Sequence, residues 1–146
     1  MEKIKVRVVR EEGIELPKYE TEGAAGLDIR ANIKEPIEIK SLGRILIPTG
    51  IKIAIPMGYE VQVRPRSGLA LKHGITLLNT PGTIDSDYRG ELKIIVANLS
   101  KDTYIVNPEE RIGQLVLNKI EQIEWEVVDS LDETDRGIGG FGHTGK

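Results

Sequence analysis

Apolar and polar residues alternate with a period of two in short runs along most of the chain. The first run covers residues 1–13, where isoleucine and valine alternate with lysine, arginine and glutamate. Side chains of an extended strand point to opposite faces in turn, so this pattern predicts strands with one face toward a core. The pattern recurs, and we expect strands at Ile37 and Ile39, at Ile51, Ile53 and Ile55, at Tyr59, Val61 and Val63, and at Ile123, Trp125 and Val127.

Turn residues separate these runs at close intervals. Pro48–Gly50 and Pro56–Gly58 each combine a proline with a glycine, and such clusters mark turns between strands. No apolar stripe with helical spacing has a useful length, so the sequence predicts an all-β sandwich or barrel. The exception is the segment 65–74, where Ser67 is expected to cap a short helix that Gly74 ends.

The segment 79–98 is expected to be a hairpin with chemistry at its bend. Runs that read as strands, 75–78 and 92–97, flank a segment rich in glycine and aspartate. Alternation along the chain would place the Asp85 carboxylate and the Tyr88 ring around one small cavity. Unpaired backbone N–H and C=O groups at the bend could form hydrogen bonds with the edge of a flat heterocycle. The alternative is a surface hairpin with solvated acids.

Arg66 directly precedes Ser67 at the expected start of the helix. A helix N-terminus presents free N–H groups and a partial positive charge, which together with Arg66 describe an anion site. The alternative is an ordinary helix cap beside a surface arginine.

Two polar residues stand inside apolar runs. Asp28 lies between Leu27 and Ile29, and we favour a structural role in which its carboxylate holds backbone amides in a turn. Indirect contact with a metal is the alternative for Asp28. Gln114 lies in the run 111–117, where its amide needs hydrogen-bond partners, either a backbone group or a ligand oxygen.

The C-terminal segment from Asp135 is too rich in glycine to build a core. It carries Arg136 and the only phenylalanine of the chain, Phe141. Residues 137–142 match the spacing GxGxxG, but no strand precedes them and no helix follows, which excludes a dinucleotide-binding fold. Backbone amides and Arg136 could bind phosphate while Phe141 stacks on a base, so we expect a segment that folds over a nucleotide. The alternative is a disordered terminus.

Length and composition limit the classes of protein to consider. With 146 residues, the chain is expected to form one domain with its own core. The formal charge of -3 argues against a general nucleic-acid binder. The sequence has no cysteine and only two histidines, so thiolate chemistry and a histidine-rich metal cage are excluded. The N-terminus resembles neither a signal peptide nor a membrane span, and we expect a cytoplasmic protein that does not bind membranes.

Five segments together resemble, in order and spacing, the motifs of the trimeric dUTP pyrophosphatases (dUTPases). They read AGLDIRA, PRSGLA, GTIDSDYRGEL, RIGQL and RGIGGFGHTG, and they span nearly the whole chain. The resemblance implies a jelly-roll-like β-clip fold with one short helix, and a homotrimer whose active sites each use motifs from all three subunits. It implies Mg²⁺ as the cofactor and dUTP as the substrate, with dUMP and pyrophosphate as products. This activity would limit uracil incorporation into DNA and supply dUMP for dTMP synthesis.

The resemblance also implies the roles of individual residues. Asp85 would be the general base for the attacking water, and Tyr88 would pack under the deoxyribose and exclude a 2′-hydroxyl. Asp28 would reach the metal only through water. Residues 1–131 would form the catalytic β domain, and residues 132–146 a flexible lid. Backbone groups near Asn79, Thr83, Ile84 and Lys93 would pair with uracil; Arg66, Ser67, Gly68 and Gln114 would bind phosphates; Arg136, Phe141, Gly142, His143 and Thr144 would close the lid.

The sequence departs from the family pattern at two positions. His143 stands where serine is common, which puts a hydroxyl contact to the γ-phosphate in doubt, and Gly113 stands where alanine is usual.

The dCTP deaminases share the fold, but they need a catalytic glutamate where this chain has Ile95. We therefore discount a deaminase or a bifunctional deaminase. A non-catalytic regulator that senses the nucleotide is a further alternative, disfavoured by the presence of Asp85 and Arg66.

Overall fold

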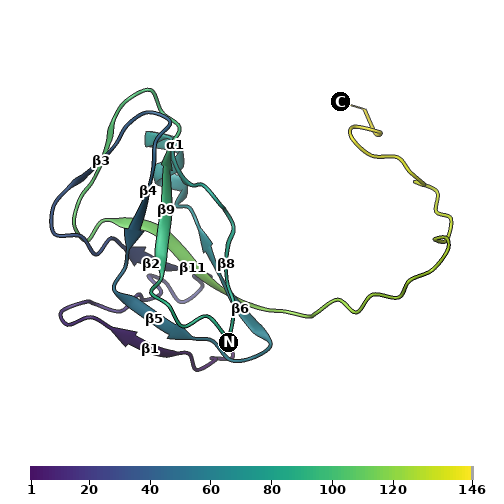
Figure 1. Cartoon of the computed structure of the whole chain (residues 1–146), viewed down its shortest axis with the longest axis horizontal. Coiled ribbons are helices and arrows are strands. Elements are labelled where there is room, and N and C mark those ends of the chain that lie inside the picture. The colour runs from purple at the N-terminus through teal and green to yellow at the C-terminus, as the bar shows by residue number, and fades with distance from the viewer. Residues whose placement is uncertain (146) are drawn as a thin grey trace.

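A computed structural model describes residues 1–145 of the chain. Within these residues the fold consists of short strands and one helix, as expected from the alternating pattern (Figure 1). The elements are β1 (Arg7–Arg10), β2 (Leu27–Arg30), β3 (Ile37–Ile39), β4 (Arg44–Pro48), β5 (Ile51–Ala54), β6 (Tyr59–Arg64), α1 (Ser67–His73), β7 (Ile75–Leu77), β8 (Gly82–Ile84), β9 (Lys93–Asn98), β10 (Tyr104–Val106) and β11 (Arg111–Lys119).

The strands form two larger sheets and two strand pairs. One sheet has the order β2-β11-β6-β8 and the other the order β4-β9-β7, while β1 pairs with β5 and β10 with β3. All of these pairings are antiparallel. Neighbouring strands are often distant in sequence, which is typical of jelly-roll-like folds. The expectation of an all-β fold with one short helix is confirmed.

Isoleucine and valine from alternate strand positions fill the core. Along β5, Ile51 and Ile53 are buried while Lys52 between them is exposed, as the period of two requires. The most deeply buried side chains belong to strands of both larger sheets, which are thereby packed together. They include Ile29, Ile47, Ile75, Ile94 and Val96.

One sequence prediction about local structure is wrong. Ser67 does not cap the helix, because the N-cap is Arg66, which makes no side-chain capping bond. The end of the helix is as predicted, since Gly74 adopts the left-handed conformation with φ 64°. The expected pairing of the runs 75–78 and 92–97 is confirmed, because β7 and β9 are antiparallel partners, but the segment between them also contains β8, which the sequence did not predict and which pairs with β6 in the other sheet.

The chain leaves the folded body after β11 and continues as an extended arm, residues 120–145 (Figure 1). Its first residue is tied to the body by a 2.9 Å bond from the Ile120 N–H to the Gly58 carbonyl. The strand expected around Trp125 is absent within the described residues, and the Trp125 side chain is 82% exposed. The reason is that a strand needs a neighbour to pair with, and the arm has none here.

Across residues 1–145 the structure has no helix with the length and apolar character needed to span a bilayer.

Candidate active site

A cavity of about 330 Å³ opens between β8 and β9. It exists because β8 belongs to one sheet and β9 to the other, so the two strands diverge instead of pairing. Six of the residues proposed to bind substrate line this cavity together. They are Asn79, Thr83, Ile84, Asp85, Tyr88 and Lys93.

The wall of this cavity includes an unpaired strand edge. β8 pairs with β6 through Ile84 opposite Val61 and Gly82 opposite Val63, and it is the last strand of its sheet. The outer edge of β8 therefore carries backbone N–H and C=O groups without strand partners among the described residues. Such an edge can hydrogen-bond a flat ligand without help from side chains.

Tyr88 is held in one orientation at the rim of the cavity. Its hydroxyl donates a 2.9 Å hydrogen bond to the backbone carbonyl of Glu91. The ring lies directly over Gly90, because a Cβ added there would meet the Tyr88 hydroxyl oxygen at 2.4 Å. A glycine at position 90 is thus required for this position of the ring.

Asp85 is exposed and available for chemistry. Its backbone carbonyl accepts a bond from the Tyr88 N–H at 3.2 Å, which forms the turn that carries both side chains. Its carboxylate makes no hydrogen bond or ion pair within residues 1–145. A solvated carboxylate beside a cavity can accept a proton from a bound water molecule.

A second cluster of predicted residues forms around Asp28. One Asp28 carboxylate oxygen lies 3.4 Å from Arg66 Nε, and the other lies 3.1 Å from an Arg111 guanidinium nitrogen. The expectation that Asp28 holds backbone amides in a turn is wrong, because Asp28 lies within β2 and pairs with arginines. Two cations with one carboxylate leave the cluster with a net positive charge, which suits an anionic ligand.

Gln114 and the start of α1 border this cluster. The Gln114 amide donates a 3.1 Å bond to the carbonyl of Pro65, which confirms one of its two expected duties, a backbone contact. The Arg66 guanidinium donates a 3.3 Å bond to the Arg111 carbonyl. Ser67 and Gly68 follow as the first residues of α1. Neither Arg66 nor its neighbours line the cavity that contains Asp85.

Sequence reasoning missed a pair of residues near Arg66. The Tyr104 hydroxyl donates a 3.0 Å hydrogen bond to the Glu110 carboxylate, and its ring packs against His73 with centroids 5.3 Å apart. Burial raises the pKa of Tyr104 to about 12, with further contributions from the bond to Glu110 and its charge, and opposed by Arg66. No sequence signal connects residues 73, 104 and 110, because only the fold brings them together.

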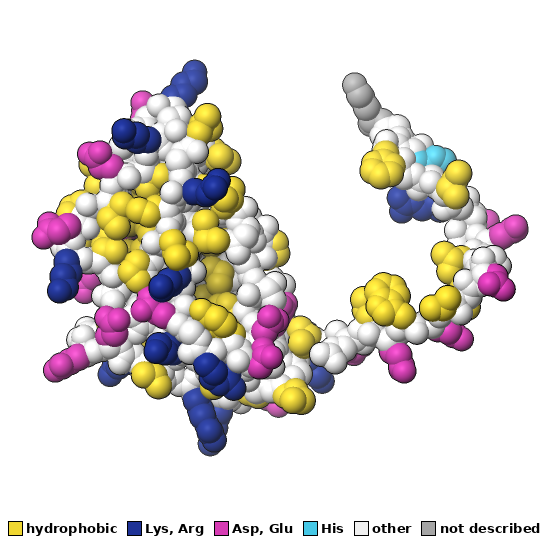
Figure 2. Space-filling model, in the orientation of Figure 1, with side chains coloured by type: hydrophobic (Ala, Val, Ile, Leu, Met, Phe, Trp, Pro, Cys, Tyr) yellow, Lys and Arg dark blue, Asp and Glu magenta, His cyan; other side chains and the backbone are white. Residues whose placement is uncertain are grey.

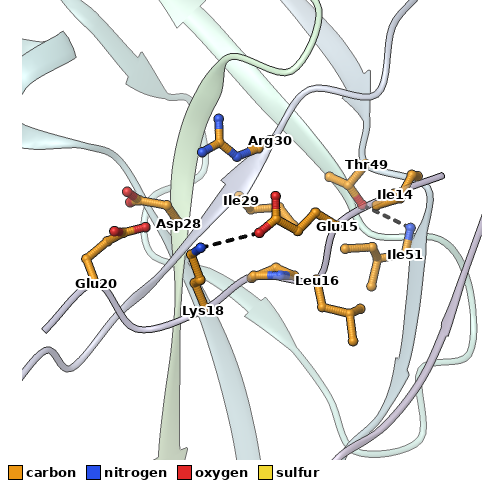
Figure 3. A pocket seen from close by; sticks show the side chains of 11 residues that line it. Ile14, Glu15, Leu16, Lys18, Glu20, Asp28, Ile29, Arg30, Thr49 and Ile51 are labelled. Carbon is orange, nitrogen blue, oxygen red and sulfur yellow. Dashed lines mark hydrogen bonds and ion pairs between the residues drawn. The ribbon is translucent and has the colours of Figure 1, made fainter. Parts of the chain in front are cut away.

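The small cavity in Figure 3 bears on the expected metal contact. It has a volume of about 30 Å³ and is lined by Asp28, Glu15 and Glu20 among others. Lys18 faces Glu15 across it at 3.4 Å. Within residues 1–145 there is no group of three acidic or histidine ligands that could hold a metal ion. Since both Asp28 oxygens face arginines, an indirect contact through water fits this chain better than direct ligation.

The residues proposed to form the lid lie on the arm, away from both clusters (Figures 1 and 2). Arg136 donates a 2.7 Å bond from Nε to the Gly139 carbonyl, and the Phe141 side chain is fully exposed. The remaining lid residues, Gly142, His143 and Thr144, follow in the same exposed segment. Within a single chain, the predicted site residues therefore form three separate groups. One lines the cavity with Asp85, the second surrounds Asp28 and Arg66, and the third lies on the arm.

The comparison with known protein families decides which family this chain belongs to. Residues 12–145 match the family model described as dUTPase. The chain belongs to the dUTPase family. Among curated dUTPases, the deoxyuridine 5'-triphosphate nucleotidohydrolase of Fusobacterium nucleatum is 73% identical over 146 residues, covering all of both chains. The enzyme of the same name from Chlamydia pneumoniae is 63% identical over 134 residues, 91% of this chain and 92% of that one.

Solved dUTPase structures share the fold. A mutant dUTPase of Staphylococcus bacteriophage 80alpha, solved with dUpNHpp, has a TM-score of 0.82 at 23% identity and covers 97% of this chain and 99% of that one. A mutant dUTPase from phage phi11 of S. aureus, described with a structural Mg(II) ion, has a TM-score of 0.78 at 23% identity, covering 89% and 100% of the two chains. At this identity the likeness establishes the architecture alone.

Proposed function

We propose that this chain hydrolyses dUTP to dUMP and pyrophosphate by attack of water on the α-phosphorus. The observation that carries the proposal is the cavity between β8 and β9, where a free carboxylate, a fixed aromatic ring and an unpaired strand edge meet. Membership of the dUTPase family and the names of relatives up to 73% identical support the same reaction.

The β8 edge would recognise the uracil ring. Backbone groups near Asn79, Thr83, Ile84 and Lys93 would pair with the ring, because uracil presents one N–H donor between two carbonyl acceptors. Cytosine presents a different donor pattern and thymine adds a methyl group, so both would be rejected. Tyr88 would pack under the deoxyribose, where its fixed ring leaves no room for a 2′-hydroxyl.

Asp85 would act as the general base. A water bound against its carboxylate gives a proton to Asp85 while its oxygen forms a bond to the α-phosphorus. The bond from the α-phosphorus to the oxygen bridging to the β-phosphorus breaks, and that oxygen leaves with pyrophosphate. Negative charge that develops on the phosphates requires cations, for which Arg66, in the net positive cluster around Asp28, is a candidate.

We infer that the complete site needs several copies of the chain, in a homotrimer. Arg66, Ser67, Gly68 and Gln114 do not line the cavity with Asp85, so another copy would have to supply these phosphate ligands. An apolar surface is available for such contacts: over β4 and β9, Figure 2 shows hydrophobic side chains in a band between charged ones. There Leu46, opposite Ile95, is 54% exposed, and both residues also line the cavity with Asp85, so this surface borders the proposed site. A trimer that buries this band would gain hydrophobic stabilisation.

The arm also supports assembly. Ile123, Trp125 and Val127 are 74%, 82% and 95% exposed, and they alternate with acidic residues as in a strand that lacks its sheet. An apolar cavity of about 430 Å³ lies beside β1, lined by Ile4, Val6 and Val8 among others. In residues 3–8, which lead into β1, basic residues alternate with these apolar ones, so the arm of a second copy would match this edge in both pattern and charge.

Magnesium would enter with the nucleotide. Mg²⁺ is commonly bound by one or two carboxylates together with substrate phosphates, and the chain has no carboxylate cage of its own within residues 1–145. Bound to the triphosphate, Mg²⁺ would neutralise charge, and Asp28 would reach it through water. A phage dUTPase with this fold is described with a structural Mg(II) ion, which supports a role for this metal in the present chain.

The C-terminal residues would complete the site by closing over it. Arg136 and the backbone amides of Gly142, His143 and Thr144 would contact phosphates, with Phe141 over the base. We retain the division into a catalytic domain, residues 1–131, and a lid, residues 132–146. With no cysteine and no membrane-spanning helix in the described residues, the chain is proposed to act in the cytoplasm, on a free nucleotide and not on nucleic acid or membranes.

The test is pyrophosphate release from dUTP with Mg²⁺, measured beside dCTP, dTTP and UTP. We expect turnover of dUTP alone, and an Asp85→Asn variant that still binds dUMP but has lost at least about 100-fold in kcat, as for removal of a general base. An Asp87→Asn variant is the matched control, since Asp87 carries the same charge in the same turn but does not line the cavity.

Two other outcomes would point to different functions. Ammonia release from dCTP would indicate a deaminase, and tight nucleotide binding without turnover would indicate a regulator. Either result would overturn the proposed activity.

A further inference from the structure

Arg111 belongs to the cluster around Asp28 and Arg66 but has no role in the reaction as proposed above. Its guanidinium donates a 3.1 Å hydrogen bond to Oδ2 of Asp28, and its backbone carbonyl accepts a 3.3 Å bond from Nη1 of Arg66. Asp28 Oδ1 in turn lies 3.4 Å from Arg66 Nε. The three residues therefore form a closed ring in which each contacts the other two.

The backbone that leads into Arg111 is tied to β2 and the residue after it. The Ala31 N–H donates a 2.8 Å bond to the Glu110 carbonyl, and the Glu109 N–H donates a 2.9 Å bond to the Ala31 carbonyl. The Arg30 guanidinium adds a 2.9 Å bond to the Glu109 carbonyl. Glu109 has a φ of 62°, a left-handed conformation that a residue other than glycine adopts at a cost. These bonds fix the point from which the Arg111 side chain starts, so it is well suited to hold another group in place.

The Arg66 guanidinium keeps one nitrogen for a ligand. Its Nε faces Asp28 and its Nη1 is bonded to the Arg111 carbonyl, whereas Nη2 has no hydrogen bond or ion pair within residues 1–145. A guanidinium binds a phosphate or a carboxylate bidentately through two adjacent nitrogens, either Nε with Nη2 or Nη1 with Nη2. Both pairs include Nη2. An acid that occupied Nη2 would therefore remove Arg66 from bidentate phosphate binding.

Asp28 is the acid placed to compete for Nη2. It already faces Nε, and a paired contact with Nε and Nη2 is the preferred geometry of a carboxylate on arginine. In the structure its second oxygen is bonded to Arg111 instead. The 3.1 Å contact with Arg111 is a good hydrogen bond, whereas the 3.4 Å distance to Arg66 Nε is longer than one. All three side chains are partly buried, so water screens this competition only in part.

We propose that Arg111 is a positioning residue of the phosphate site, which holds Asp28 away from Nη2 of Arg66 and so leaves this nitrogen free for phosphate. Without Arg111, Asp28 would take Nε and Nη2 of Arg66 together, and the cluster would lose its net positive charge. Arg111 does not touch the nucleotide in this role. The inference rests on the proposed function, since it concerns the proposed phosphate ligand Arg66.

Nucleotide binding without metal tests the proposal separately from any contact between Asp28 and Mg²⁺. The probes are the triphosphate analogue dUpNHpp and the monophosphate dUMP, with Kd measured by calorimetry in EDTA. In Arg111→Met we expect the Kd of dUpNHpp to rise about tenfold, as for loss of one hydrogen bond to a charged group, and the Kd of dUMP to stay within about threefold. Adding Asp28→Asn to Arg111→Met should return the Kd of dUpNHpp to within about threefold of wild type, because no carboxylate remains to occupy Arg66.

Arg30→Met is the matched control for the loss of charge. Arg30 lies opposite Arg111 in the register of β2 and β11, but it forms no ion pair with Asp28 within the described residues. We expect its Kd for dUpNHpp to stay within about threefold of wild type. Arg111→Lys keeps a cation for Asp28 and should lose less affinity than Arg111→Met. The Tm and oligomeric state of each variant identify a folding defect.

The outcomes separate this inference from the proposed function. If wild type fails to release pyrophosphate from dUTP, the proposed function is wrong. If wild type is active but Arg111→Met keeps the wild-type Kd for dUpNHpp, the role of Arg111 is wrong. The same holds if the double variant binds as weakly as Arg111→Met, or if Arg30→Met loses as much affinity, which would assign the effect to net charge.

A crystal structure of wild type with dUpNHpp decides the matter independently of any variant. We expect Nη2 of Arg66 within about 3.2 Å of a phosphate oxygen, with the Arg111 guanidinium still bonded to Asp28. A phosphate oxygen bonded directly to the Arg111 guanidinium, or an Asp28 carboxylate that has left Arg111, would overturn the proposal.

Discussion

Gly90→Ala is predicted to impair substrate selection with only a small loss of stability. The added Cβ would lie 2.4 Å from the Tyr88 hydroxyl oxygen and 2.6 Å from Cζ of the ring. Contacts that short are not tolerated, so the ring must rotate away. Because Tyr88 is 45% exposed, it can do so into solvent without disturbing the core. The rotation would break the 2.9 Å bond to the Glu91 carbonyl.

The structural cost of this rotation is small. A single net hydrogen bond at a partly exposed position is worth about 1 kcal/mol. For a chain of this size that corresponds to a fall in Tm of about 2–5 °C. The functional cost is larger, because a displaced ring no longer closes the space beside the sugar. A loss of about 1.4 kcal/mol in discrimination lowers the preference for dUTP over UTP tenfold.

The assay is kcat/KM for dUTP and UTP, with Tm measured on the same samples. Gly23→Ala is the matched control, because no atom lies within 4 Å of a Cβ added there. We expect the dUTP/UTP ratio to fall about tenfold in Gly90→Ala and to be unchanged in Gly23→Ala. An unchanged ratio in Gly90→Ala, with Tm lowered as calculated, would refute the role given to the fixed Tyr88 ring.

Three further predictions concern stability and the arm. Asn98→Ala should lower the free energy of unfolding by about 3 kcal/mol in urea titrations, because the buried amide donates to the Ile39 and Asp102 carbonyls at 2.8 Å; a loss below about 1 kcal/mol would contradict this. Tyr104 has its pKa raised to about 12, so it contributes stability below pH 10 that is lost between pH 10 and 12, and the advantage of wild type over Tyr104→Phe should shrink across that range; a constant difference would contradict it. Truncation after Asp135 should lower kcat at least about tenfold and leave Tm unchanged, whereas equal losses in both would assign the segment a structural role.

The strands could be predicted from the sequence wherever burial follows the period of two. In β5 and β6 the apolar residues that alternate along the sequence are also the residues whose side chains face the core. The helix end was also predictable, because Gly74 takes a conformation that other residues avoid. β8 was not recognised, since it is only three residues long and its partner β6 is distant in sequence.

The site was predictable only where its residues are neighbours in sequence. Asp85 and Tyr88 share one turn, and the structure brings them to one cavity. The ion pairs of Asp28 with Arg66 and Arg111 could not be foreseen, because three separate segments meet there. The alternation around Trp125 does predict strand character, but a strand forms only where a partner edge is present.

The most direct measurement of the central claim, a dUTP site shared between chains, mixes two inactive variants. Asp85→Asn lacks the proposed base and Arg66→Ala lacks a proposed phosphate ligand, and the two are denatured together in equal amounts and refolded. If each site takes Asp85 and Arg66 from different copies, roughly a quarter of the sites in random oligomers contain both intact residues, and activity should return to that level. Mixtures that stay as inactive as the separate variants, while wild type treated in the same way recovers, would contradict the claim.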